Sequence, residues 1–86
     1  MWKGVIRVPT NRRMADVLAE VSAQERVSAK DILGHSRRGE LVRIRWKAWV
    51  LMHEAGRSYS EIGRFFKRDH TSVLHGVREH YKRLGS

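Results

Sequence analysis

Six consecutive residues, 67–72, place two cations in front of four polar side chains. Aspartate, histidine and threonine side chains can hydrogen-bond to the edges of base pairs in the major groove, and the threonine methyl group can pack on that of thymine. Lysine, arginine and serine side chains suit phosphate oxygens. The pattern therefore predicts base contacts from Asp69, His70 and Thr71, and phosphate contacts from Lys67, Arg68 and Ser72.

A second group of cations lies between residues 37 and 47, where five basic side chains stand against the single acidic Glu40. Residues 35–86 carry twelve basic and five acidic groups, whereas residues 1–34 carry six and four. The formal charge of +9 is therefore concentrated in the second part of the chain. Clustered cations at this density are typical of proteins that bind polyanions. The alternative is a solvated charged face with no partner.

Metal binding and catalysis find little support in the same region. His70, His75 and His80 are five positions apart, so successive rings point about 140° apart around a helix, whereas metal ligands on one helix favour a spacing of four. The serine, histidine and aspartate near position 70 are neighbours on one helix and do not face one another as a nucleophile and its base must. We therefore expect no metal site and no enzymatic activity.

Length and composition exclude further classes of protein. The 86 residues contain no cysteine, which excludes a disulfide framework and a cysteine zinc site. The seven glycines form no phosphate-binding string, so we expect no cofactor. No apolar run approaches the ~20 residues that span a bilayer, and none resembles an export signal. We expect a cytoplasmic location and no membrane partner.

The spacing of the apolar residues predicts an all-α fold, a compact bundle of about five helices. The first helix is expected to begin after an N-cap at Thr10 or Asn11 and to end near Glu25. The other helices are expected over residues 28–33, 40–55, 58–66 and 69–84. Residues 1–9 are expected to form a short extended N-terminal arm, and residues 10–86 a single domain.

The last two predicted helices form a helix-turn-helix, with the polar residues described above in the first turn of the second helix. Ser58 and Glu61 match the capping box that starts the shorter helix. We expect Phe66 in the core and Phe65 partly exposed. The inward residues expected on the longer helix are Val73 or Leu74, Val77, Tyr81 and Leu84.

Two tryptophans, Trp46 and Trp49, lie three positions apart on the predicted helix over 40–55. Large rings contribute heavily to the core of a small domain, so the edge of the core is the favoured position. An exposed patch that binds a partner protein is the alternative. Trp2 lies in the predicted arm, where it fits either a hydrophobic clasp on the helices or a contact with another protein.

A resemblance to a known family rests on three segments, 61–63, Phe66 and 68–75, which read E-I-G, F and R-D-H-T-S-V-L-H. They are similar to the signature of the C-terminal DNA-binding domain of the bacterial replication initiator DnaA. The resemblance extends over residues 12–84. It departs from the family at Lys67, which stands where the family has paired glycines, and in the absence of an ATP-binding module from the 86 residues.

The resemblance implies that the domain docks as a monomer, rather than a dimer, on a short site in double-stranded DNA. Residues 68–72 would lie in the major groove. One arginine of the basic loop would contact bases in the adjacent minor groove. By position it is Arg37, with the neighbouring Arg38 as the alternative. Arg38 and Arg45 are the phosphate contacts that the resemblance adds.

We therefore interpret the chain as a stand-alone DnaA-like domain that binds double-stranded DNA sequence-specifically and associates with the nucleoid. It would act as a transcriptional regulator or replication modulator without ATPase activity. One alternative is non-specific binding of nucleoid DNA or of RNA, driven by charge alone. Another is a DNA-bound adaptor that recruits a polymerase or a replication protein through an exposed tryptophan.

Overall fold

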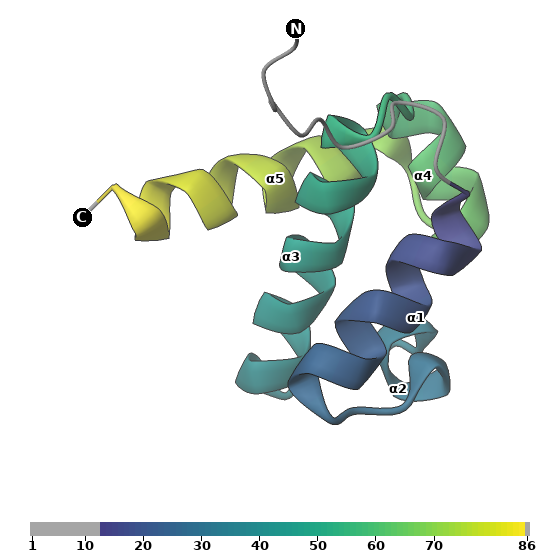
Figure 1. Ribbon diagram of the computed structural model, residues 1–86. Helices are drawn as coiled ribbons and strands as arrows, with labels where there is room; N and C mark the ends of the chain where they lie inside the picture. Colours follow the sequence, from purple (N-terminus) through teal and green to yellow (C-terminus); the bar gives the residue numbers. More distant parts are fainter. Residues whose placement is uncertain (1–12, 86) are drawn as a thin grey trace, which may run out of the picture.

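This computed structural model describes residues 13–85, which contain five α-helices. The helices are α1 (Met14–Glu25), α2 (Ala29–Leu33), α3 (Gly39–Glu54), α4 (Tyr59–Phe66) and α5 (His70–Leu84) (Figure 1). No strand occurs within these residues. The all-α prediction is therefore confirmed, while the predicted arm over residues 1–9 lies outside the described residues.

Side chains start two of the helices as their sequence predicts. The Ser28 hydroxyl accepts a hydrogen bond from the Asp31 N–H at 3.1 Å and caps α2. In the capping box of α4, the Ser58 hydroxyl accepts from the Glu61 N–H at 3.1 Å, and the Glu61 carboxylate accepts from the Ser58 N–H at 2.8 Å. The Ser58 N–H holds the pKa of Glu61 below its ordinary value.

The start of α1 differs from the prediction. This helix begins at Met14, with Arg13 at the N-cap and no side-chain hydrogen bond to cap it. Thr10 and Asn11, the expected caps, lie outside the described residues. The helix ends near the expected position because Arg26 adopts a left-handed conformation, with φ 57°, and its backbone N–H donates to the Ser22 carbonyl.

The core forms around α3, which packs against each of the other four helices. Apolar side chains from all five helices meet there: Val17, Leu18, Val21, Ile32, Ala48, Trp49, Val50, Met52, Ile62, Phe66, Val73 and Val77. The rings of Trp49 and Phe66 meet edge to face, with centroids 5.7 Å apart. Phe66 is buried and Phe65 only half-buried, as expected from the sequence.

A glycine allows α5 to lie directly against α3. A Cβ atom added at Gly76 would overlap the six-membered ring of Trp49 and lie 2.5 Å from Cδ1 of Trp46. Trp49 is therefore a core residue, only 3% exposed, whereas Trp46 is half-buried at the edge of the contact. The two rings together set how closely α5 crosses α3.

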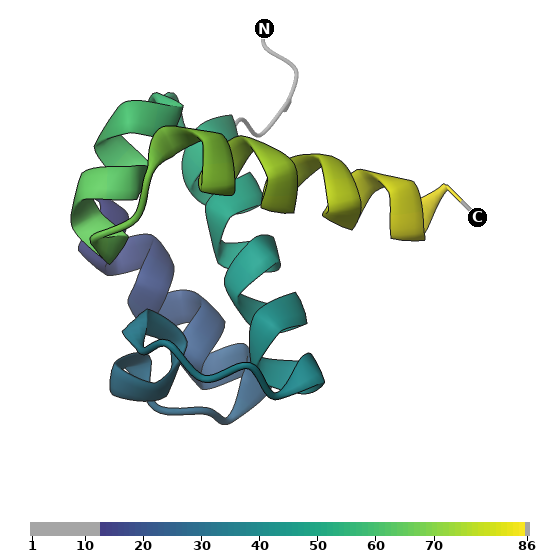
Figure 2. The ribbon, with the colours of Figure 1, turned by 180° about the vertical axis from the view of Figure 1, so that it is seen from behind.

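The end of α5 projects from the bundle. Figure 2 shows α5 crossing α3 and continuing beyond it to the C-terminus. Val77 is the last buried residue of the helix, and Tyr81 and Leu84 are 49% and 69% exposed. The predicted inward position of Tyr81 and Leu84 is therefore wrong. The apolar spacing of α5 continues to these residues, but no other described helix extends far enough to cover them.

Candidate nucleic-acid interface

A three-residue turn joins α4 to α5. Lys67 adopts the left-handed conformation, with φ 56° and ψ 47°, and ends α4. The backbone N–H of Arg68 then donates to the Gly63 carbonyl at 2.7 Å. Asp69 returns to extended geometry at the N-cap of α5. The single Lys67 thus performs the reversal for which helices ordinarily use glycine.

The turn crosses α4 at Gly63. A Cβ atom at this position would lie 2.5 Å from the Arg68 carbonyl oxygen, closer than real Cβ atoms approach backbone. Gly63 is buried under the turn, and its carbonyl accepts the Arg68 N–H at 2.7 Å, so a side chain at this position would push the turn away from α4. The absence of a side chain at Gly63 therefore sets the angle at which α5 leaves α4.

Replacing Lys67 with glycine is expected to raise the free energy of unfolding by about 0.5–1 kcal/mol. A left-handed residue with a Cβ atom costs roughly 1–2 kcal/mol, part of which glycine offsets by its greater freedom in the unfolded chain. Urea unfolding of the two proteins measures the difference. Lys67→Ala removes the same charge but keeps the left-handed strain, so a gain of equal size in both variants would contradict the explanation.

The first turn of α5 presents the predicted base-reading side chains together. Asp69, His70, Thr71 and Ser72 are all exposed. The Asp69 carboxylate does not cap the helix; instead its Oδ1 lies 3.2 Å from Nδ1 of His70. With a proton on Nδ1 donated to Asp69, Nε2 is the ring nitrogen left to accept a hydrogen bond. The exposed first turn of α5 therefore presents hydrogen-bond acceptors and hydroxyl groups together.

The basic loop over residues 34–38 connects α2 to α3 and carries two exposed arginines. Nη2 of Arg38 lies 2.7 Å from Oε1 of Glu40, and the Arg38 backbone N–H donates to the Ser36 hydroxyl at 3.2 Å. Arg37 is exposed and makes no ion pair with any residue in the described part of the chain. Of the two side chains, that of Arg37 is the one that makes no ion pair with the described residues.

Arg68 ties this loop to the helix-turn-helix. Its Nη2 donates to the Gly34 carbonyl at 2.8 Å and lies 3.1 Å from Nδ1 of His35. The guanidinium lies over the Trp49 ring, 5.8 Å from the centroid, and burial lowers its pKa. The side chain predicted to contact phosphate is thus half-buried and engaged with the protein.

Arg45 of α3 also holds this loop. It is 4% exposed, and its Nε donates to the Ile32 carbonyl at 2.8 Å while Nη1 donates to the Ser36 carbonyl at 3.2 Å. Burial, and then the charge of Arg68, lower its pKa. The guanidinium is turned into the protein, away from the exposed position that the predicted phosphate contact requires.

The sequence contained a signal for the burial of Arg45. The residue lies four positions after Leu41 and three before Ala48, on the apolar face of α3. A cation on such a face is buried with its charge satisfied by neighbouring carbonyls or carboxylates. The charge density of the segment hid this signal, because it made every arginine there resemble a surface residue.

Within residues 13–85, no three side chains among histidine, aspartate and glutamate are grouped as metal ligands would be. None of the five described helices is both long and apolar enough to cross a membrane. The exposed polar end of α5 and the loop that carries Arg37 are joined by the Arg68 side chain, and together they form the candidate site.

Comparison with known families bears directly on this arrangement. A family model described as the bacterial DnaA protein helix-turn-helix matches residues 14–79. This range includes all of α1 to α4 and most of α5. The chain belongs to the DnaA helix-turn-helix family. Membership of this helix-turn-helix family supports DNA binding.

Individual DnaA relatives agree with the family match. The chain is 44% identical over 72 residues to the chromosomal replication initiator protein DnaA of Thermomicrobium roseum, covering 81% of this chain and 16% of that protein. It is 41% identical over 73 residues to the DnaA proteins of Rhodopseudomonas palustris and Nitrobacter hamburgensis. Those matches cover 83% of this chain and 16% and 15% of the relatives. No solved structure matches the chain.

Proposed function

We propose that this DnaA-family domain binds double-stranded DNA sequence-specifically through two connected elements. The first turn of α5 would enter the major groove, and Arg37 of the basic loop would enter the adjacent minor groove. The observation that carries the proposal is the hydrogen bond from Arg68 to the Gly34 carbonyl, 2.8 Å long. It fixes the spacing between the two elements, as simultaneous contact with neighbouring grooves requires.

Base discrimination is assigned to Asp69, His70 and Thr71. A carboxylate accepts from the cytosine amino group, an imidazole nitrogen accepts from the adenine amino group, and the threonine methyl packs on thymine. All three side chains are exposed at the same helix end. The contact between Asp69 and Nδ1 of His70 supports the assignment, because it orients the imidazole before DNA arrives.

Phosphate contacts are assigned to Lys67, Ser72 and Arg38, which are exposed around these two elements. Such contacts fix the register of a protein on the duplex but do not read its sequence. Arg45 and Arg68 are assigned to positioning instead. Their charges still contribute to the positive potential that attracts DNA.

In the cell, such a domain would act as a transcriptional regulator or replication modulator at the nucleoid, binding as a monomer and without ATPase activity. Occupation of a site is sufficient for either role. Non-specific binding of DNA or RNA is the second candidate, because the formal charge of +9 favours any polyanion. Both candidates predict that affinity falls steeply with salt, so sequence preference must decide between them.

Substituting the base-reading side chains separates these candidates. His70→Ala and Thr71→Ala are each expected to weaken binding to the preferred duplex by about 1–3 kcal/mol while leaving random duplex nearly unaffected. Fluorescence anisotropy with both duplexes at one salt concentration measures the two affinities. His75→Ala is the matched control, because His75 is an exposed histidine of the same helix outside its first turn.

Equal losses on the preferred and random duplexes would contradict base reading by His70 and Thr71. Such equal losses would favour the non-specific candidate. A loss on the preferred duplex as large in His75→Ala as in His70→Ala would instead contradict the assignment of base reading to the first turn of α5.

A further inference from the structure

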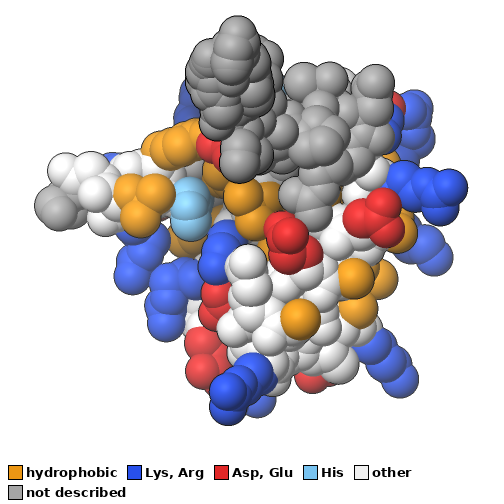
Figure 3. Space-filling model, viewed as in Figure 1, with side chains coloured by type: hydrophobic (Ala, Val, Ile, Leu, Met, Phe, Trp, Pro, Cys, Tyr) orange, Lys and Arg blue, Asp and Glu red, His pale blue; other side chains and the backbone are white. Residues whose placement is uncertain are grey.

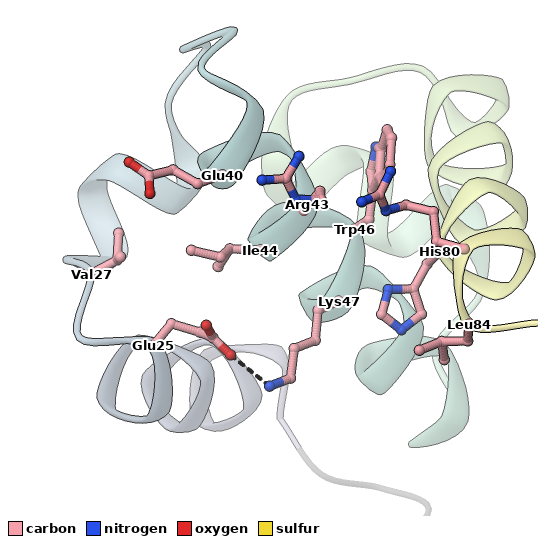
Figure 4. A pocket seen from close by; sticks show the side chains of 10 residues that line it. Glu25, Val27, Glu40, Arg43, Ile44, Trp46, Lys47, His80 and Leu84 are labelled. Carbon is pink, nitrogen blue, oxygen red and sulfur yellow. Dashed lines mark hydrogen bonds and ion pairs between the residues drawn. The ribbon is translucent and has the colours of Figure 1, made fainter. Parts of the chain in front are cut away.

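A groove crosses the first half of α3, from the link between α1 and α2 on one side to the projecting end of α5 on the other. Its volume is about 730 Å³, and it is open to solvent. In Figure 3, Lys and Arg side chains gather below α5 beside hydrophobic side chains and a histidine. Figure 4 shows Ile44 of α3 pointing toward Val27, and His80 and Leu84 approaching from α5.

The floor and one rim of the groove are apolar. Val27, Ile44 and Trp46 are half-buried there, and Leu84 is 69% exposed at the α5 side. A leucine left in water beside partly covered apolar side chains marks a surface that gains free energy when another apolar group covers it. Because Trp49 is buried, Trp46 is the described tryptophan that remains available to a partner.

The charges around the groove leave an excess of cations. Both carboxylates are already paired: Glu25 lies 2.7 Å from Nζ of Lys47, and Glu40 lies 2.7 Å from Nη2 of Arg38. Two further lining arginines, Arg43 and Arg83, are exposed and make no ion pair with any residue of the described chain. The apolar surface is therefore flanked by positive charge.

We propose that this groove binds an acidic amphipathic helical segment of a partner protein. Apolar side chains spaced at i, i+3, i+4 and i+7 would cover Ile44, Trp46 and Leu84, while carboxylates would meet Arg43 and Arg83. A second copy of this chain is a poorer occupant, because two molecules with a formal charge of +9 repel each other.

The groove is separate from the proposed DNA-binding elements. Its lining residues include none from the basic loop over 34–38 and none from the turn and helix start over 67–72. The partner segment and DNA would therefore contact different residues of the domain. This inference goes beyond DNA binding, because it gives the DNA-bound domain a means of recruiting another protein.

A synthetic peptide tests the inference. The probe is a fluorescein-labelled helical peptide with leucines at i, i+3, i+4 and i+7 and glutamates elsewhere; a scrambled peptide of the same composition is its control. The intact chain is expected to bind the probe more tightly than the scrambled peptide. Leu84→Ser is expected to weaken that binding about tenfold, because the complex loses the burial of one leucine side chain.

Tyr81→Ser is the matched control variant, because Tyr81 is an exposed hydrophobic residue of the same helix that does not line the groove. It is expected to change binding of the probe less than about twofold. Equal binding of both peptides, or equal loss in the two variants, would overturn the inference. So would displacement of the probe by duplex DNA, which would show that the peptide occupies the DNA-binding elements.

The test does not depend on the proposed function. Both serine variants retain the base-reading and phosphate-contacting residues, so their sequence preference is expected to equal that of the unmodified chain. Loss of probe binding with that preference retained tests the groove alone. A chain that binds the probe but shows no sequence preference would instead contradict only the proposed function.

Discussion

Replacing Gly63 with alanine is expected to destabilise the domain by about 1–3 kcal/mol, although alanine ordinarily favours a helix over glycine by about 1 kcal/mol. The reason is the Arg68 carbonyl oxygen, which would lie 2.5 Å from the new Cβ atom. The turn must then move away from α4 and carry the first turn of α5 with it. Urea unfolding measures the stability, and sequence preference of the folded variant is expected to fall as well.

Gly39→Ala is the control for the stability measurement. Gly39 begins α3, and a Cβ atom there would meet only the flexible end of the Arg43 side chain, at 3.3 Å. This variant is expected to equal or exceed the stability of the unmodified chain. If Gly63→Ala behaved in the same way, the close crossing at Gly63 would not be what holds the turn.

Arg45→Met is expected to separate a positioning role from a phosphate contact. The substitution keeps an apolar stem but leaves the Ile32 and Ser36 carbonyls without the donors seen at 2.8 and 3.2 Å. We expect a loss of stability of about 1–3 kcal/mol. The binding free energy for the preferred duplex is expected to weaken by about 1–3 kcal/mol, as for one lost specific contact. The reason is that Arg45 no longer holds the loop that carries Arg37.

The salt dependence of DNA binding distinguishes the two possible roles of Arg45, positioning of the loop and contact with phosphate. A residue that only positions the loop neutralises no phosphate, so the slope of log affinity against log salt is expected to stay the same in Arg45→Met. Loss of a phosphate contact would instead reduce that slope by about 1. Arg43→Met removes an exposed cation from the same helix and is expected to change stability by less than about 0.5 kcal/mol.

Local features of the fold could be predicted from sequence because each depends on neighbouring residues. The capping box of Ser58 and Glu61 and the cap at Ser28 need only the residues of one turn. The end of α5 could not be predicted in the same way. The periodic pattern of Tyr81 and Leu84 matches an inward face, but their exposure depends on whether another helix reaches that far.

In the candidate site, too, features set by neighbouring residues could be predicted, and features set by distant residues could not. The exposed first turn of α5 agrees with the position predicted for Asp69, His70 and Thr71, because a helix end is defined locally. The roles of Arg45 and Arg68 depend on carbonyl groups thirteen and thirty-four positions away in the chain. Charge alone made both arginines resemble surface cations, and only the packing of α3 against α2 and the turn separates them from Arg37.

Sequence-specific binding through α5 and the basic loop can be tested by selecting bound duplexes from a random library. We expect enrichment of one short site, containing a major-groove segment next to a narrow, A·T-rich minor groove. We also expect His70→Ala to relax the preference within the first segment, and Arg37→Ala to relax it within the second. A bound pool with no enriched site would rule out sequence-specific binding and leave charge as the sole basis of binding.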